Sequence, residues 1–532
     1  MAVAPKAHNF AVMKDRKKTL LTFVMLLACC GHAAALDIVI KTQKEFDALQ
    51  SSLSKAVSAG EKKVTVKISA GTYYYNDKHV NVSGWNHPKT SVAIQGQGQC
   101  VLVSKGKRRA NGDKYGDWFN KQSTYLDAAL DEVSIWSGTL QAADTVQILS
   151  EEDKTCLLPY KGLTPADGKS CVNSYVRVTR WYTSAVYKIE KITKKGIVFK
   201  CDDLAYSSYL KTHNINGDYG FHNNVGAKGA AYPRFRLCNV DGCSPLRITD
   251  KVTSSKGTLY ECRVSTFLNV EKSSLKGLEV SGITFNGNAY GWERAVMTVK
   301  NSKFGEGMTV KDNTFRNMKT EVLHLAKTDG VTFSANKAEN CALGVLWSDN
   351  DCAKTTVTGN SFVNCNTGLT NTSCVHCSGT DFTVSENRFT DFGYCAVGTG
   401  VWWGTEMAYP CSGVISDNEM SFSDGYMKNL RKYTLMDSGA IYVATQTSGV
   451  VIENNDIHDY SGVYQNRGIF LDDGTCNCTV RDNSVNDIPN SYCIDLRKIS
   501  YAGNAKNKSK SFNTGNVLSG NACDGKVRFE TN

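Results

Sequence analysis

The chain of 532 residues has no apolar run long enough to cross a membrane. Its most extended one, Leu20–Cys30, falls short of the roughly 20 apolar residues that a transmembrane helix needs. Basic residues from Lys14 to Lys18 precede this run and the small residues Ala33–Ala35 follow it, which is the order of a secretory signal. We therefore expect residues 1–35 to be a signal peptide and the mature protein to be secreted or periplasmic.

The same segment allows a second interpretation. Leu26-Leu27-Ala28-Cys29 has the pattern of a bacterial lipoprotein cleavage site, in which Cys29 would carry the lipid. The mature protein would then be anchored at the cell surface instead of released. The sequence leaves both fates open.

The chain also lacks the basic runs with interleaved aromatic residues that mark a nucleic-acid-binding surface. Removal of residues 1–35 leaves 56 Lys and Arg against 50 Asp and Glu, a net charge of +6. This mild excess is compatible with an acidic glycan as partner. It gives no reason to expect nucleic acid.

Metal-ligand spacings are scarce although the chain has 20 cysteines. Cys374-Val-His-Cys377 and Cys476-Asn-Cys478 resemble zinc ligand pairs only superficially, because neither is matched by a second pair. Eighteen cysteines remain after removal of residues 1–35, and an even number in an exported protein predicts disulfides. We therefore expect disulfides and no bound metal.

A repeat runs through the C-terminal half of the chain. It consists of an apolar residue, two further residues, Asn, one residue, an apolar residue, one residue, and then Asn or Asp. Apolar and polar residues alternate with the period of a strand. Asn stands where the chain turns, because it tolerates left-handed backbone geometry and its amide can bond to the same amide one coil away. The repeated asparagines are 23 to 37 residues apart, which fits one coil of a parallel solenoid: Asn313, Asn336, Asn360, Asn387, Asn418, Asn455 and Asn483, with Asn516 as a weaker last copy.

Other repeat folds fit less well. Leucine-rich repeats need a leucine scaffold that this chain lacks, and a propeller blade needs ~40 or more residues with four strands. At the start of the mature chain, Thr42 and Glu45 have the spacing of a capping box. One helical face follows, up to Gly60: Phe46, Leu49, Leu53 and Val57.

These patterns predict an all-β protein, a right-handed parallel β-helix with an N-terminal capping helix. Residues 36–103 would hold the cap and the first coils, and residues 271–532 the coils that carry an active-site groove. Between them, residues 104–270 lack the Asn repeat and are rich in Cys, Tyr and Trp. This segment predicts an inserted or flanking β-rich lobe.

Several short segments carry a resemblance to a known superfamily. After Trp181 come VYKIEKI, IVFK, FRLCN (235–239), GTLYE (257–261) and LEVSGITFNGN (278–288), and later DSGAIY and GIFLDDG. This order resembles the pectate-lyase-like right-handed β-helix proteins that act on carbohydrates, and its pattern is most similar to that of their glycoside hydrolases. The resemblance covers most of the mature chain. It implies that Asp437 of DSGAIY and the pair Asp472 and Asp473 of GIFLDDG occupy positions of catalytic carboxylates.

Stacking the segments after each Asn turn also predicts which side chains meet. One inward apolar column results: Leu323, Val345, Leu369, Val397, Ile441, Ile469 and Ile494. The residue after each of these should face solvent, which places His324, Tyr442, Phe470 and Asp495 in one outward row. Adjacent coils lie ~4.8 Å apart, so Tyr442, Phe470 and Asp495 are expected to be neighbours.

Glycoside hydrolysis needs two carboxyl groups, one to protonate the leaving oxygen and one as nucleophile or base. The candidates are Asp437, Asp472 and Asp473, with Asp495 next. A structural alternative is a pairing of Asp472 with Arg497 one coil away, and Asp-Asp-Gly is also good turn chemistry.

Substrate contacts are expected around these carboxylates. Two long excursions, 392–410 and 421–436, should wall the groove, and Trp402 with Trp403 could stack on sugar rings or pack over the solenoid flank. The further candidates for substrate binding are Tyr442, Arg467, Asp495, Arg497, His324 and His458.

Three functions are compatible with this pattern. The first is a glycoside hydrolase that uses paired aspartates and no cofactor. The second is a polysaccharide lyase on uronate glycans, in which Arg467, Arg497 or Lys498 moves the proton and Asp side chains hold Ca²⁺. The third is a glycan-binding adhesin without catalysis. In each case we expect a monomer with a glycan partner, and fold alone does not choose among them.

Overall fold

Alternating burial marks the inside and the outside of many strands. In β22 (Met308–Lys311), Met308 and Val310 are buried, whereas the two residues between and after them are partly exposed. The same pattern recurs in β25 (Val331–Ser334) and β31 (Phe382–Ser385). Each coil therefore buries one apolar face of every strand it contributes.

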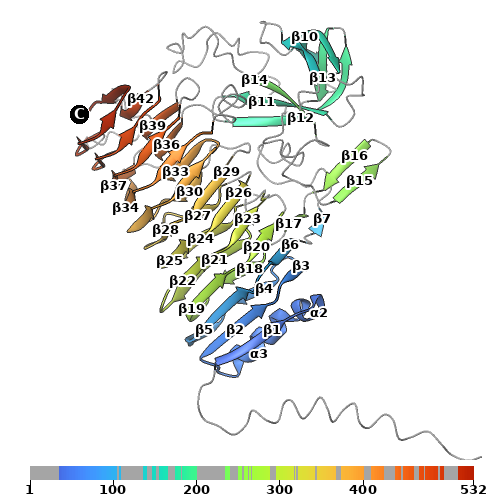
Figure 1. Cartoon of the computed structure of the whole chain (residues 1–532), viewed down its shortest axis with the longest axis vertical. Coiled ribbons are helices and arrows are strands. Elements are labelled where there is room, and N and C mark those ends of the chain that lie inside the picture. The colour runs from blue at the N-terminus through green and yellow to red at the C-terminus, as the bar shows by residue number, and fades with distance from the viewer. Residues whose placement is uncertain are drawn as a thin grey trace, which may run out of the picture.

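The computed structural model shows how these strands stack (Figure 1). It describes the following residues: 35–104, 107–108, 136–140, 147–150, 155–165, 174–180, 183–193, 195–200, 234–239, 250–254, 257–261, 263–264, 266–287, 295–316, 318, 321–341, 344–366, 373–400, 409–423, 438–444, 447–460, 466–472, 474–488, 492–496 and 513–531.

The strands form three parallel columns, which we call A, B and C, and the chain passes through them in the order C, A, B in each coil. Column A contains β1 (Ala35–Ile40), β2 (Lys63–Ile68), β5 (Asn86–Gly96), β19 (Ser274–Ser281), β22, β25, β28 (Thr356–Thr358), β31, β34 (Tyr409–Ser416), β37 (Thr447–Glu453), β40 (Thr479–Arg481) and β43 (Val517–Ser519). Column B contains β3 (Gly71–Tyr75), β6 (Cys100–Ser104), β20 (Thr284–Asn286), β23 (Thr314–Arg316), β26 (Lys337–Cys341), β29 (Ser361–Cys365), β32 (Arg388–Thr390), β35 (Glu419–Ser421), β38 (Asp456–His458), β41 (Ser484–Val485) and β44 (Ala522–Cys523). Column C contains β4 (Val80–Ser83), β18 (Leu268–Glu271), β21 (Met297–Phe304), β24 (Leu323–Thr328), β27 (Leu346–Ser348), β30 (Ser373–Cys377), β33 (Cys395–Thr399), β36 (Ser438–Val443), β39 (Asn466–Leu471), β42 (Tyr492–Leu496) and β45 (Lys526–Phe529).

The predicted asparagine ladder occupies the corner between columns A and B. Asn387 shows its geometry: its Oδ1 accepts hydrogen bonds from the backbone N and the Nδ2 of Asn360, and its own Nδ2 donates to Val357 O and Asn418 Oδ1. The ladder residues are almost completely buried, so the amides take the place of water for the backbone groups of the corner. This arrangement confirms the prediction that the asparagines stack coil upon coil.

Two details of the ladder differ from the prediction. The last member is Asn521, whose Oδ1 accepts from Asn483 N, and Asn516 instead bonds to Cys478 N outside the ladder. The left-handed backbone belongs to the residue before each ladder position, such as Asp312 with φ 56° or Glu386 with φ 57°. The asparagine itself is needed for its amide and not for its backbone freedom.

The interior of the solenoid is filled by stacked apolar side chains. The ring centroids of Phe285 and Phe315 lie 5.1 Å apart, and those of Phe315 and Phe333 lie 5.9 Å apart. All three side chains are fully buried. Phe285 and Phe315 pair in register on neighbouring coils of column B, whereas Phe333 comes from column A, so rings from both columns stack in the interior.

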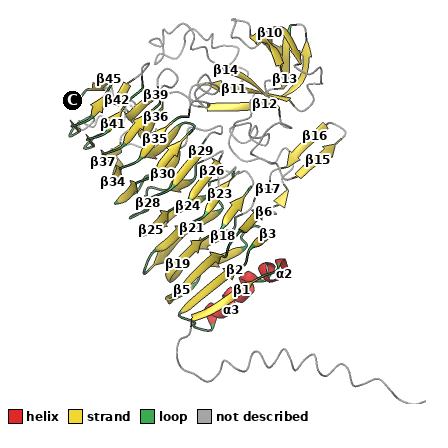
Figure 2. Ribbon diagram, viewed as in Figure 1, coloured by secondary structure: helices red, strands yellow, loops and turns green. Residues whose placement is uncertain are grey.

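Helices cover the N-terminal end of this core, as predicted (Figure 2). The short α2 (Gln43–Asp47) begins with the expected capping box, in which Thr42 Oγ1 accepts from Glu45 N and Glu45 Oε2 accepts from Thr42 N. It is followed by α3 (Leu49–Ser58). Both helices turn their apolar face to the first coils: Phe46, Leu49, Leu53, Ala56 and Val57. No helix in the described part of the chain is long and apolar enough to cross a membrane.

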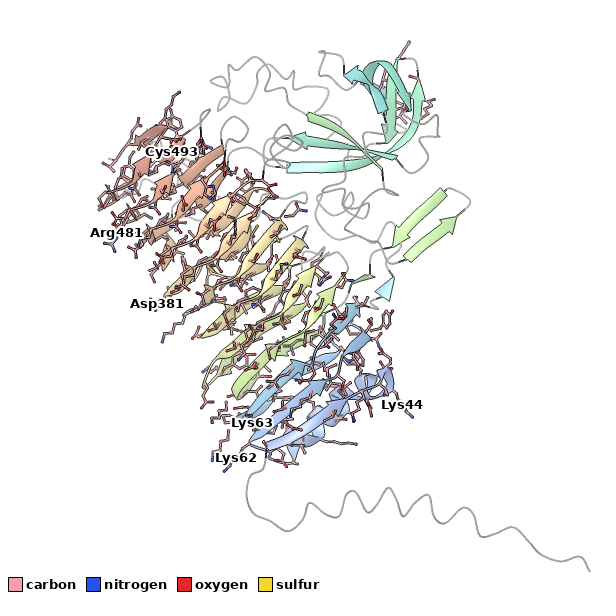
Figure 3. All side chains as sticks on the ribbon, viewed as in Figure 1. Lys44, Lys62, Lys63, Asp381, Arg481 and Cys493 are labelled. Carbon is pink, nitrogen blue, oxygen red and sulfur yellow. The ribbon has the colours of Figure 1, made fainter. Side chains whose placement is uncertain are left out.

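A second set of strands is inserted between β6 and β18. Seven of them pair in an antiparallel sheet: β8 (Trp136–Leu140), β9 (Gln147–Ser150), β10 (Thr155–Pro165), β11 (Ser174–Arg180), β12 (Thr183–Thr193), β13 (Gly196–Lys200) and β14 (Arg234–Asn239). A hairpin of β15 (Asp250–Ser254) and β16 (Gly257–Glu261) follows, and β7 (Lys107–Arg108) pairs with β17 (Arg263–Val264) where the insertion leaves and rejoins the solenoid. Figure 3 shows Arg481 and Asp381 along the edge of the solenoid that faces away from these strands.

Among the cysteine side chains that the structure describes in the solenoid, Cys341, Cys352, Cys365, Cys374 and Cys377 are buried free thiols. Cys341 and Cys365 each lie five residues after a ladder asparagine, a spacing that predicts their stacking on adjacent coils, and they do pair in register. The bridge between them that the stacking made conceivable is not formed in the structure. The even number of cysteines and the expected export predicted disulfides. In the structure, Cys341 and Cys365 instead pack in the core as apolar groups.

We expect Asn387→Ala to lower the free energy of unfolding by about 3 kcal/mol, because it leaves buried backbone groups of two neighbouring coils without a partner. Denaturant unfolding measures this change. Asn86→Ala, at an exposed position of β5, is the control and should have almost no effect. Equal stability of both variants would contradict the role of the ladder.

We also expect Cys341 and Cys365 to resist alkylation in the folded protein and to react after unfolding without reductant. Both are fully buried, and burial raises the pKa of the Cys365 thiol well above its ordinary value. Peptide mass spectrometry after iodoacetamide treatment reads out both states. A linked 341–365 peptide would instead show that the disulfide forms in the exported protein.

Candidate functional site

The long connections of the solenoid all flank column C. The corner between columns A and B holds only two residues in the repeat, such as 312–313 between β22 and β23. The links from column B to column C are much longer, for example 422–437 between β35 and β36, and the inserted lobe leaves at this same corner. On the other side of column C, the link 400–408 leads from β33 to β34. Because long excursions from a rigid scaffold carry function, column C is the candidate functional face.

One row of side chains runs along the outer side of column C, and we call it the outer row. Register pairing places its members on consecutive coils: His324, Trp347, His376, Gly398, Tyr442, Phe470, Asp495 and Arg528. The predicted grouping of His324, Tyr442, Phe470 and Asp495 in one row is thus confirmed.

Sequence reasoning missed two members of this row. Leu346 and Val375 pair in the inward column where Val345 and Leu369 were predicted. The predicted inward position is off by one residue in β27, which turns the side chains of this strand to the other face, and by six residues in β30, so Trp347 and His376 were not recognised. The links before β27 and β30 differ in length. The sequence repeat therefore does not predict which residues of these two strands pair with the preceding coil.

The outer row does not face solvent throughout, which corrects the prediction. Tyr442, Phe470 and Asp495 are 3%, 0% and 0% exposed. Tyr442 packs against Phe470 with ring centroids 5.1 Å apart and against Tyr394 at 5.9 Å. These rings form a small apolar cluster separate from the solenoid core.

Asp472 lies beside this cluster, just after β39. Its Oδ2 accepts a hydrogen bond of 2.5 Å from the Tyr442 hydroxyl, and the residue is 5% exposed. A carboxyl group is therefore held outside the core, away from bulk water and next to aromatic rings. The predicted neighbours Asp437, Asp473, Arg497, Trp402 and Trp403 lie outside the described residues.

The start and the end of the strands in column C lie far apart. Ser438, which follows Asp437 in the chain, pairs with Asn466 at the start of β39. Asp472 lies six residues beyond Asn466, roughly 20 Å along the strand at ~3.3 Å per residue. A carboxyl pair for glycoside hydrolysis needs a separation of ~5 to 9.5 Å, so partners of Asp472 are to be sought at the C-terminal end of these strands.

Asp495 and Arg467 neutralise each other, so neither offers the free binding group that was predicted. Arg467 Nε donates to Asp495 Oδ2 at 2.8 Å, and Arg528 donates to both carboxylate oxygens at 2.7 and 2.9 Å. Burial alone would raise the pKa of Asp495, but the hydrogen bonds and charges of Arg528 and Arg467 bring it below its ordinary value. The guanidinium of Arg467 also lies 3.9 Å above the Phe470 ring. Asp495 is an ion-pair centre that joins the last three coils.

A second polar cluster surrounds His324, five coils before Asp472. His324 Nδ1 donates to Glu321 Oε2 at 2.9 Å and Nε2 to Asp349 Oδ2 at 3.4 Å. The indole Nε1 of Trp347 donates to Asp349 Oδ1 at 2.9 Å. Burial alone would lower the pKa of His324, but the bonds to Asp349 and Glu321 raise it to about 9. The imidazole is thus charged at neutral pH, and sequence reasoning found neither of its two carboxylate partners.

His376 behaves in the opposite way. It is buried beneath Trp347, with ring centroids 4.0 Å apart, and burial lowers its pKa to about 4. The Ser378 hydroxyl lies 2.6 Å from its Nε2. Two histidines on one row therefore differ in charge, because one has carboxylate neighbours and the other has an aromatic ring and backbone.

His458 lies apart from this face. It belongs to β38 in column B, where Nδ1 lies 2.8 Å from Asp459 Oδ2 and Nε2 lies 3.6 Å from Glu419 Oε1. A role in the same site as Tyr442 is thus not supported by its position. In the part of the chain that the structure describes, no group of three or more His, Cys, Asp or Glu side chains is arranged to hold a metal ion.

Comparison with known proteins identifies the fold. A family model described as a right-handed β-helix region matches residues 305–525. No curated protein matches the sequence. A solved structure described as a glycoside hydrolase superposes with a TM-score of 0.55 at 11% identity, over 92% of this chain and 97% of that one.

Two further solved structures match at lower similarity. PfbA, a surface adhesin of Streptococcus pneumoniae, has a TM-score of 0.41 at 10% identity over 93% of this chain and 91% of its own. The A-module of the mannuronan C-5 epimerase AlgE4 of Azotobacter vinelandii has 0.38 at 10% identity over 94% and 96%. Together with the strand columns, the family match confirms the predicted right-handed parallel β-helix.

We expect the stability of the protein to fall as the pH rises through about 9. Folding raises the pKa of His324 from 6.5 to about 9, so the charged histidine stabilises the native state. This contribution to stability is complete below about pH 6.5 and is lost as the pH rises through the folded pKa of about 9. The melting temperature of His324→Gln should therefore decrease less than that of the parent between about pH 7 and about pH 9.5. His87→Gln on β5, which lies away from this cluster, is the control, and equal pH slopes for parent and His324→Gln would refute the assignment.

Proposed function

We propose that the protein is an exported glycoside hydrolase in which Asp472 is one of the two catalytic carboxyl groups. The observation that carries this proposal is the Tyr442–Asp472 pair, a carboxyl group in a water-poor setting outside the core. It lies on the column that the long connections flank. Such a group is suited to move a proton to or from a glycosidic oxygen.

The second carboxyl group is proposed to be Asp473. It is the residue after Asp472 in the sequence, whereas Asp437 is the residue before Ser438, with which β36 begins. The length of the strand therefore favours Asp473 over Asp437 as the partner. The Tyr442 hydroxyl would orient Asp472 by its hydrogen bond.

The lyase alternative receives less support from the geometry. A lyase would need a basic residue to abstract the proton, together with Ca²⁺ held against a uronate carboxylate. Among its candidates only Arg467 is described, and its guanidinium is engaged by Asp495 and Phe470. A group compensated in this way is poorly placed to act as a base.

Incubation with neutral and acidic glycans tests the reaction class. We expect new reducing ends without unsaturated sugars. Unsaturated uronate products would show a lyase, and binding without any product would show an adhesin.

On a glycan that the parent cleaves, Asp472→Asn should lower kcat by about 10²-fold or more, because Asn keeps the shape and removes the titrating group. Asp456→Asn, an exposed position on column B, is the matched control and should keep parental kcat. Near-parental turnover of Asp472→Asn, with loss in Asp437→Asn instead, would move the catalytic pair to the other end of column C. Melting temperatures of all variants verify that the fold is intact.

A further inference from the structure

The two ends of the solenoid are closed differently. Helices α2 and α3 cover the N-terminal end, and they are the only helices among the described residues (Figure 2). The C-terminal coil consists of β43, β44 and β45, each of which pairs with a strand of the preceding coil. Its side chains Val517 and Val527 are 50% and 45% exposed. Because a terminal coil is held from one side, an additional link to the solenoid has its largest effect here.

Two cysteines meet at the base of this coil. Cys493 belongs to β42 in column C, and Cys523 is the last residue of β44 in column B. Their thiols hydrogen-bond to each other. Cys493 Sγ also lies 3.8 Å from Asp524 Oδ1, and a Cβ at Gly525 would come within 2.9 Å of this sulfur. The thiol of Cys493 is therefore directed at the chain that follows Cys523.

The backbone around the pair is fixed by the ladder. Cys523 pairs in register with Val485 of the preceding coil, and Asp524 N donates to Val485 O at 3.4 Å. Only Asp524 and Gly525 link β44 to β45, so the chain has little freedom between the two columns. Gly525 has no side chain to displace the Cys493 sulfur. The two cysteines are thus held next to each other without a covalent bond between them.

Accessibility distinguishes this pair from the thiol pair in the middle of the core. Cys341 and Cys365 are also in contact, but both are fully buried and out of reach of an oxidant. Cys523, in contrast, is partly exposed. The hydrogen bond from Cys493 lowers the pKa of Cys523, whereas the same bond and burial raise the pKa of Cys493. Cys523 is therefore the thiol that reacts first.

We propose that Cys493 and Cys523 form a disulfide in the exported protein, and that this bond clamps the C-terminal coil to the solenoid. The oxidant is a disulfide of a small thiol or of an exchange protein in an oxidising compartment. The Cys523 thiolate attacks one sulfur of this disulfide, which forms a mixed disulfide and releases one thiol. The Cys493 thiol then loses its proton, and its sulfur displaces the second thiol. Two cysteine thiols are oxidised, and one disulfide is reduced to two thiols.

The position of the bond explains what it adds to the fold. It crosses the corner between columns B and C, whereas the asparagine ladder ties the coils at the corner between columns A and B. A disulfide across this corner restricts the open states of the C-terminal coil and so keeps the coil closed. The inference rests on the export that is part of the proposed function, because a reducing compartment would keep both thiols free.

Peptide mass spectrometry without reductant tests the bond in the full-length protein, both as isolated from the exporting cells and after treatment with oxidised glutathione. We expect a linked peptide that contains Cys493 and Cys523 in both samples. Free thiols at both positions after glutathione treatment would overturn the disulfide. A link that forms only with glutathione would overturn the export, and with it the bond in the natural protein. Turnover of a glycan has no part in this measurement, so its result does not depend on the hydrolase assignment.

Hydrogen–deuterium exchange tests the clamp. Reduction with dithiothreitol should speed exchange in β43, β44 and β45 by at least about tenfold and leave β2 and β5 unchanged, because only the C-terminal coil loses its link. Cys523→Ser should exchange fast without reductant and show no further change with it. Cys100→Ser, at a buried cysteine of β6, is the matched control and should keep the dependence on reductant. A linked pair whose reduction leaves exchange in β43, β44 and β45 unchanged would overturn the clamp.

Discussion

The buried amide ladder is the constraint on which the rest of the structure depends. Each ladder asparagine closes the corner between columns A and B and bonds to the amide of the next coil, so this corner tolerates neither insertion nor deletion. Columns A and B are therefore held in register along the solenoid. Length variation is confined to the two corners beside column C, and this is where the long links and the inserted lobe leave the scaffold.

Because column C collects these links, its side chains meet partners that are distant in sequence. Asp495 is bound by Arg467 and Arg528, which are 28 and 33 residues away. Tyr442 and Asp472 are 30 residues apart. Cross-coil contacts of this kind join adjacent turns, so one face combines structural ion pairs with groups that remain able to bind a ligand.

Three aspartates of this face show how the surroundings decide the role of the same side chain. Asp495 has two guanidinium groups and no exposed surface, which makes it a structural ion-pair centre. Asp349 pairs with the charged His324 and remains partly exposed. Asp472 has a tyrosine hydroxyl beside an aromatic cluster, a setting suited to proton transfer. Residue type alone would have given all three the same function.

The sequence by itself determined the asparagine ladder, the capping box at Thr42 and Glu45, and the inward positions Leu323, Ile441, Ile469 and Ile494, because these follow from periods within single strands and from a corner of constant length. Only the tertiary structure decided the register of β27 and β30, since the links before them vary in length and cross-coil packing selects the pairing. It therefore decided that Trp347 and His376 belong to the outer row and that Glu321 and Asp349 enclose His324. It also showed that Tyr442, Phe470 and Asp495 are buried, because burial outside the core depends on neighbouring coils that no local pattern records.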